Sequence, residues 1–98
     1  MTISFNRNAL QLDGNPFTDG GEVQYLSKIL ANQLSISIKG DPIKYYDWAR
    51  ALYKVGEIEV DRADFDFLKN FVSQLEISII IKAQLLECFV LAPEGKKK

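Results

Sequence analysis

Residues 40–61 read GDPIKYYDWARALYKVGEIEVD, and this stretch determines most of the predicted fold. Asp41 and Pro42 indicate a helix start, because an Asp side chain accepts free backbone N–H groups and a proline has no N–H to leave unpaired. The helix is expected to end just before Gly56, which supplies the left-handed residue that commonly follows a helix. Charged and apolar side chains then alternate over residues 57–60, which predicts a short strand.

Two further helices are predicted on the C-terminal side of this stretch. Asp61 is placed to cap the first of them, whose apolar residues recur with helical spacing as far as Leu75. The second is expected from about residue 78 and is stopped by Pro93, although Ile79–Ile81 has strand propensity.

The N-terminal part of the chain combines a helix with short strands. Apolar residues predict an amphipathic helix over about 22–35, and the alternation at 35–38 leaves its end open between helix and strand. Residues 2–6 alternate like a half-buried strand, and the turn signal at 13–16 predicts either a short hairpin or a strand followed by an irregular loop. The expected fold class is therefore α+β, mainly α, with about four helices and two or three short N-terminal and central strands.

The composition is that of one soluble globular domain. The chain has 98 residues, of which 47% are hydrophobic and 26% are charged, which is enough for a single core. We expect this domain to span residues 1–92 and to be followed by a flexible basic tail at 93–98. No secretory signal and no membrane-spanning stretch is recognised, so a cytoplasmic location is expected. The lone Cys88 is interpreted as a small buried hydrophobe.

Several kinds of catalytic and metal site are excluded by residue types that are missing. The chain has no histidine, so it cannot form a Ser-His-Asp or Cys-His arrangement or a histidine zinc site. No glycine pattern matches a phosphate-binding loop. We therefore expect no enzyme activity, no catalytic residues, no cofactor and no bound metal.

Acidic residues concentrate in segment 57–66, and we call four of them the acidic ridge: Glu57, Glu59, Asp64 and Asp66. The simplest interpretation is a solvated surface with helix-capping roles. Docking of a basic partner and acid–base catalysis are the alternatives. The formal net charge of −1 argues against a nucleic-acid partner, because phosphate binding normally requires a basic face.

Two predicted helices carry more apolar surface than one small core is expected to cover. Tyr46 and Tyr53 lie along the edge of the apolar stripe of the helix that begins at Pro42, and aromatic side chains are favoured at interfaces. The last helix is apolar nearly all round, so it is either central or covered by another chain. We therefore predict a protein partner or self-association into a homo-oligomer. The candidate interaction residues are Tyr46, Tyr53, Ile80, Ile81, Leu85 and Phe89.

A series of short sequence blocks extends from residue 3 to residue 87. The blocks are Ile3–Asn6, Leu12–Gly14, Leu30–Leu34, Lys39–Ala49, Leu52–Tyr53, Gly56–Asp61, Leu68–Lys69 and Lys82–Glu87. Together they resemble short uncharacterised proteins encoded by phages and prophages. The resemblance implies a mobile-element origin in a bacterial host, a cytoplasmic or virion-associated location, and no catalytic residues.

The leading functional hypothesis is a phage-type accessory or assembly protein that acts through protein–protein contacts. The alternative is a DNA-binding regulator of winged-helix-like type, with Lys44, Arg50 and Lys54 as its basic stripe. The acidic start of the helix after Asp61 argues against it, because phosphate would repel those carboxylates. A third hypothesis is a DNA mimic built on the acidic ridge, but the net charge is too low for convincing mimicry.

Overall fold

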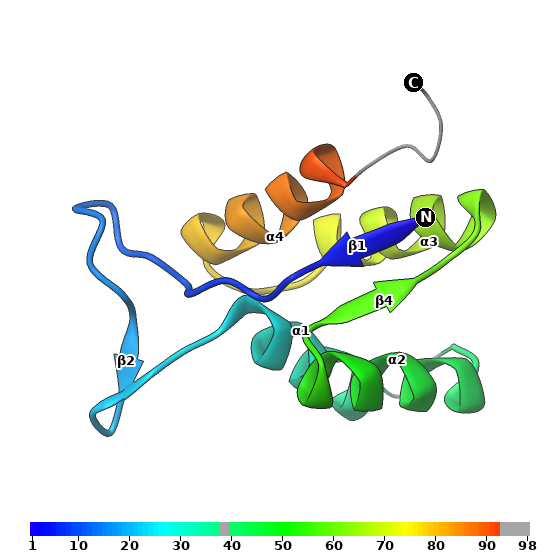
Figure 1. Ribbon diagram of the computed structural model, residues 1–98, viewed down its shortest axis with the longest axis horizontal. Coiled ribbons are helices and arrows are strands. Elements are labelled where there is room, and N and C mark those ends of the chain that lie inside the picture. Colours follow the sequence, from blue (N-terminus) through cyan, green and yellow to red (C-terminus); the bar gives the residue numbers. More distant parts are fainter. Residues whose placement is uncertain (38–39, 93–98) are drawn as a thin grey trace.

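A two-stranded sheet lies between two pairs of helices (Figure 1), in a computed structural model that describes residues 1–37 and 40–92. The elements, in chain order, are β1 (Thr2–Ser4), β2 (Thr18–Asp19), β3 (Glu22–Val23), α1 (Leu26–Ile36), α2 (Pro42–Lys54), β4 (Glu57–Glu59), α3 (Arg62–Ser73) and α4 (Ile79–Leu91). Helix α1 packs on α2 and α3 packs on α4. The predicted fold class, α+β and mainly α, is confirmed. The predicted tail at 93–98 lies outside the described residues.

The starts of α2 and α3 follow the local signals in the sequence. The Asp41 carboxylate accepts hydrogen bonds from the backbone N–H groups of Ile43 and Lys44, at 3.1 and 3.2 Å. Asp61 does the same for the N–H of Asp64, at 2.8 Å. Each bond satisfies a donor that the helix itself leaves free, so the predicted caps of α2 and α3 are confirmed.

The central sheet joins the N-terminus of the chain to its middle. Strand β1 runs antiparallel to β4 and pairs Ile3 with Ile58, and both side chains are buried. The ammonium group of Met1 donates to the carbonyl oxygen of Val60 at 2.7 Å. On one side β1 contacts α4, and on the other β4 contacts α2, so this small sheet connects the two helix pairs.

The structure differs from the sequence-based prediction before α1. The helix begins at Leu26 rather than near residue 22, because Glu22–Val23 forms β3 and pairs with β2 across a turn at Gly20 and Gly21. Both glycines have positive φ angles, of 61° and 88°, which most other residues adopt only with strain. This hairpin extends away from the helices (Figure 1).

The sequence is compatible with either helix or strand at the end of α1, and the structure extends the helix through Ile36. The last residues of the alternating pattern lie partly outside the described ranges. At the C-terminal end, the predicted helix is confirmed at Ile79–Leu91, so the strand propensity of the three isoleucines does not prevail.

Candidate interaction surfaces

A groove lies between α1 and α2, the two helices joined by the short connection after Ile36. Its volume is about 330 Å³. Ala31 and Ala49 form its apolar base, since both small side chains lie at the helix–helix contact and are largely buried. The remaining lining residues are polar, aromatic or basic: Lys28, Asn32 and Ser35 from α1, and Tyr46, Arg50, Tyr53 and Lys54 from α2. We call this feature the α1–α2 groove.

Two exposed tyrosines carry basic groups over their rings in this groove. Tyr46 and Tyr53 are 60% and 64% exposed, so they lie outside the core. The guanidinium carbon of Arg50 is 5.3 Å from the centre of the Tyr46 ring. The ammonium nitrogen of Lys28, on α1, is 5.0 Å from the centre of the Tyr53 ring, on α2. Both cation–π contacts hold positive charge at the groove, and the contact between Lys28 and Tyr53 connects its two walls.

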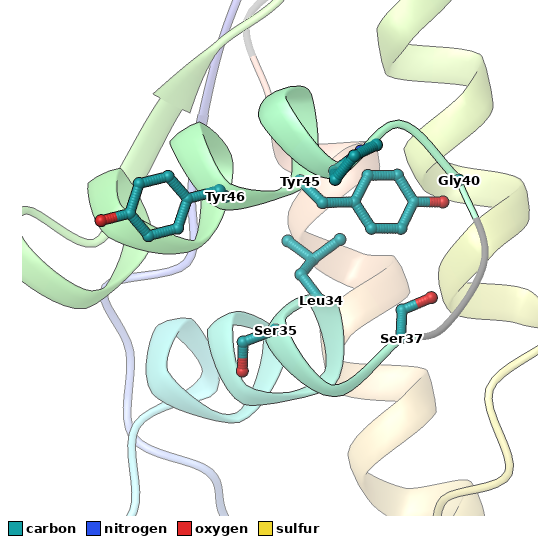
Figure 2. Close-up of a pocket in the computed structure, with 7 residues that line it drawn as sticks. Leu34, Ser35, Ser37, Gly40, Tyr45 and Tyr46 are labelled. Atoms are coloured by element: carbon teal, nitrogen blue, oxygen red, sulfur yellow. The ribbon is translucent and has the colours of Figure 1, made fainter.

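A second cavity of about 280 Å³ adjoins the groove near the connection between the helices and shares Ser35 and Tyr46 with it. Figure 2 shows the Tyr45 ring directed toward Gly40, with Leu34 beside it and Tyr46 directed the other way. A β-carbon at Gly40 would overlap the Tyr45 ring, so only glycine leaves room for this arrangement. Burial raises the pKa of the Tyr45 phenol, because an apolar environment disfavours its anionic form.

The second surface is on α4, which lies at the edge of the molecule (Figure 1). Ile79 and Val90 are 76% and 74% exposed. Ala83 is exposed as well, whereas Leu86 is partly buried and also packs against the core. These four positions are separated by four, three and four residues, which places them on one side of the helix. We call them the outer face of α4. Leu91, which is 63% exposed, lies beside it.

Two of the predicted interaction residues on α4 are in the core instead. Leu85 and Phe89 are 0% and 2% exposed. The Phe89 ring makes edge-to-face contacts with Phe5 at 5.5 Å and with Phe65 at 5.4 Å between ring centres. The prediction that Leu85 and Phe89 exceed what the core can cover is therefore wrong, because α4 packs this side against β1, α1 and α3.

The other two predicted residues on α4, Ile80 and Ile81, are intermediate. Both are partly buried, and Ile81 packs against the core. They lie between the buried side of the helix and its outer face, so neither is the centre of an exposed patch.

Two of the four carboxylates of the acidic ridge form ion pairs within the described residues. Glu57 and Glu59 are exposed on β4, on the side opposite Ile58. Asp64 forms an ion pair with Lys44 at 3.0 Å, and this hydrogen bond is the main reason that the pKa of Lys44 is raised. Asp66 lies 3.6 Å from Arg62, one turn away on α3. Half of the ridge therefore contributes to contacts within the chain.

The described residues contain no group of three or more His, Cys, Asp or Glu side chains that could hold a metal ion. In that same part of the chain, no helix combines the length and the apolar character needed to cross a membrane. Cys88 is buried, with 2% of its surface exposed, and its thiol donates to the Gln84 carbonyl oxygen at 3.5 Å. Burial is the main cause of the raised pKa of this thiol.

Sequence reasoning missed one wall of the groove and most of the outer face of α4. The apolar periodicity of α1 marks its buried side and gives no indication of Lys28, Asn32 or Ser35 on the other side. A signal was available, because residues 23–40 contain no Asp or Glu. On α4 the signal was the spacing of Ile79 and Val90, which a search for heptad-like patterns finds.

No protein-family model matches this chain, and neither a curated protein nor a solved structure matches it significantly. Inference about its function therefore rests on the α1–α2 groove and on the outer face of α4.

Proposed function

We propose that this protein is a phage or prophage accessory or assembly protein that acts through protein–protein contacts, and that it associates with itself through the outer face of α4. One observation supports self-association most directly: Ile79 and Val90 are each about three-quarters exposed on a helix side whose other members are Ala83 and Leu86. Burying one such aliphatic side chain in an interface contributes about 1.5–3 kcal/mol. Apolar side chains aligned along one side of a helix are a common feature of helix–helix interfaces.

The spacing of the outer face suits a helix from a second copy. Separations of four, three and four residues are those of the seam between two helices in a coiled coil. Assigned this way, Lys82 and Glu87 occupy the positions that flank the seam on opposite sides. In a parallel pair, Lys82 of one helix faces Glu87 of the other, whereas an antiparallel pair brings like charges together. The charge pattern therefore favours a parallel two-fold pair.

The size of the surface sets the expected strength of association. The outer face spans residues 79–90, and a stable interface normally covers about 800 Å² on each partner. A single short helix falls near the lower end of that range. We therefore expect reversible self-association that depends on protein concentration, in the micromolar range.

Sedimentation velocity over a range of protein concentrations tests this proposal. The native chain is expected to show a concentration-dependent dimer, and Val90→Lys is expected to remain monomeric, because the new charge cannot be buried in an apolar seam. Leu12→Lys is the matched control, since Leu12 is 95% exposed and lies in the segment between β1 and β2, outside α4. A native chain that stays monomeric at about 100 µM contradicts self-association.

The DNA-binding alternative has less support. Of its predicted basic stripe on α2, Lys44 is paired with Asp64, so Arg50 and Lys54 remain. Helix α3 begins with Arg62 but carries Asp64 and Asp66 in its first two turns, which would repel a DNA backbone. Salt-dependent retention on duplex DNA would favour this alternative over the assembly proposal.

A further inference from the structure

The charges around the α1–α2 groove are all of one sign. Lys28, Arg50 and Lys54 line it, and none of its lining residues is acidic. This is unusual for a chain with a formal net charge of −1. The α1 side, residues 23–40, contains no Asp or Glu. The α2 side, residues 46–54, contains one, Asp47, which is not among the residues that line the groove.

Within the described part of the chain, Lys28, Arg50 and Lys54 form no ion pair. Over residues 1–37 and 40–92, the ion pairs within 4.0 Å are Lys44 with Asp64 and Arg62 with Asp66, neither of which involves the groove. Lys28 and Arg50 are held instead over tyrosine rings. A ring face attracts a cation without cancelling its charge, so these groups keep their attraction for an incoming carboxylate.

The apolar part of the groove lies between these charges. Ala31 and Ala49 form the base, and Tyr46 and Tyr53 stand beside it with most of their surface exposed. A volume of about 330 Å³ accepts an apolar side chain, which the tyrosine rings can contact along their edges. The groove is therefore suited to a ligand that presents an apolar side chain next to negative charge.

We propose that the α1–α2 groove binds a short extended segment of a partner protein, in which acidic residues flank an aromatic or branched apolar residue. The carboxylates pair with Lys28, Arg50 and Lys54, and the apolar side chain lies over Ala31 and Ala49. From Lys28 to Ser35 the helix rises by about 10 Å, a length that three or four extended residues cover.

A peptide fits these observations better than a single-stranded nucleic acid does. Stacking of bases requires free aromatic faces, whereas Lys28 and Arg50 already cover one face of each groove tyrosine. The three cations also cluster at one groove instead of forming a track along the surface, and the phosphate backbone favours such a track. The groove is on α1 and α2, so this inference does not depend on self-association through α4.

The test is a titration of the ¹⁵N-labelled protein, followed by NMR, with a capped peptide of sequence Asp-Glu-Phe-Glu-Asp. Saturable shifts are expected for the amides of Lys28–Ser35 and Tyr46–Lys54, with an affinity in the micromolar to millimolar range. Peptides with Ala in place of Phe, or with Lys in place of the acidic residues, are expected to bind more weakly. The same titration of Val90→Lys separates this outcome from that of self-association.

Charge reversal identifies the residues responsible. Arg50→Glu and Lys28→Glu are each expected to weaken binding of the acidic peptide about tenfold, because each removes an attractive charge and adds a repulsive one. Lys69→Glu, an exposed lysine on α3, is the matched control and is expected to leave binding unchanged. The proposal is overturned by an absence of saturable shifts at millimolar peptide, by equal binding to Arg50→Glu, or by tighter binding of a short oligothymidine.

Discussion

The two sides of α4 carry similar side chains in opposite environments. Leu85 and Phe89 face inward and are almost completely buried, whereas Ile79 and Val90 face outward and are about three-quarters exposed. Hydrophobicity alone does not distinguish these positions, because aliphatic residues occur on both sides. What distinguishes them is the presence of Phe5 and Phe65 on one side. A helix that is apolar on all sides and lies at the edge of a small domain can bury only one side in the core. Its other apolar side stays exposed.

The α1–α2 groove differs in chemical character from the outer face of α4. Its exposed tyrosines are already in contact with Lys28 and Arg50, so this surface combines apolar and charged groups and suits a ligand that carries both an apolar side chain and negative charge. The outer face of α4 has no such polar contacts at Ile79 and Val90, and it suits another apolar surface. The two surfaces therefore favour different partners.

The largest expected effect is on the stability of the fold, and it is seen by comparing substitutions of two neighbouring residues on the two sides of α4. Phe89→Ala is expected to lower the free energy of unfolding by about 3–5 kcal/mol, because it removes the ring that packs between Phe5 and Phe65 and leaves a cavity. Val90→Ala, one position further, is expected to change it by less than about 0.5 kcal/mol in the monomer. Urea unfolding at low micromolar concentration measures both values. Similar losses for both variants would contradict the assignment of the two sides.

The side of α4 that faces the core could not be read from the sequence, although the helix itself could. The starts of α2 and α3 depend on local chemistry at Asp41 and Asp61, and they were therefore predictable. The orientation of α4 depends on Phe5, which is 84 positions away from Phe89 in the chain. A helix that is apolar nearly all round contains no local signal for this choice.

The start of α1 and the composition of the groove could not be predicted from the sequence for two other reasons. Residues 22–23 fit the helical spacing, but they pair with β2 across two glycines, and this local hairpin displaces the helix start. The groove combines Lys28 with Tyr53, and only the packing of α1 on α2 brings these residues together. The exposed tyrosines were predictable from α2 alone, whereas the basic residue from the opposite wall was not.

A smaller expected effect is a pH dependence of the unfolding free energy that arises from the buried side of α4. Burial raises the pKa of the Cys88 thiol above its ordinary value of 9.0. As the pH rises past 9, the unfolded chain loses this proton first and so binds fewer protons than the folded chain, which makes stability fall with pH. The contribution is fully present below pH 9 and is lost as the pH approaches the folded-state pKa. The Tyr45 phenol acts in the same direction from about pH 10, because its pKa is also raised.

Cys88→Ala isolates the thiol in this pH dependence. Its unfolding free energy, measured by urea titration between pH 7 and 10, is expected to decline less steeply than that of the native chain. The variant should also be less stable at pH 7 by about 1 kcal/mol, because it leaves a small cavity. Equal slopes in the two proteins would show that the thiol is not held in an apolar environment, and would weaken the distinction between the two sides of α4.

The smallest expected effect tests the arrangement of helices at the outer face. In a parallel pair, Lys82 of each copy faces Glu87 of the other, so Lys82→Glu creates two repulsive contacts. At about 0.5 kcal/mol for each contact, the dimer dissociation constant is expected to rise about fivefold. The double variant Lys82→Glu with Glu87→Lys restores both attractive contacts and should return the constant to its native value. Sedimentation equilibrium measures the dimer dissociation constant of each variant. The measurement is made at low salt, because salt screens such exposed charge pairs.

Lys69→Glu controls for the change in net charge, because it makes the same change on α3 and is expected to leave dimerisation unaffected. An antiparallel pair gives a different pattern. Lys82 then lies near its own counterpart, so Lys82→Glu exchanges one repulsion for another and the dissociation constant hardly changes. The double variant is then also close to native. The single variant therefore decides between the two orientations, because only the parallel pair is weakened by reversing Lys82 alone and recovered by reversing Glu87 as well.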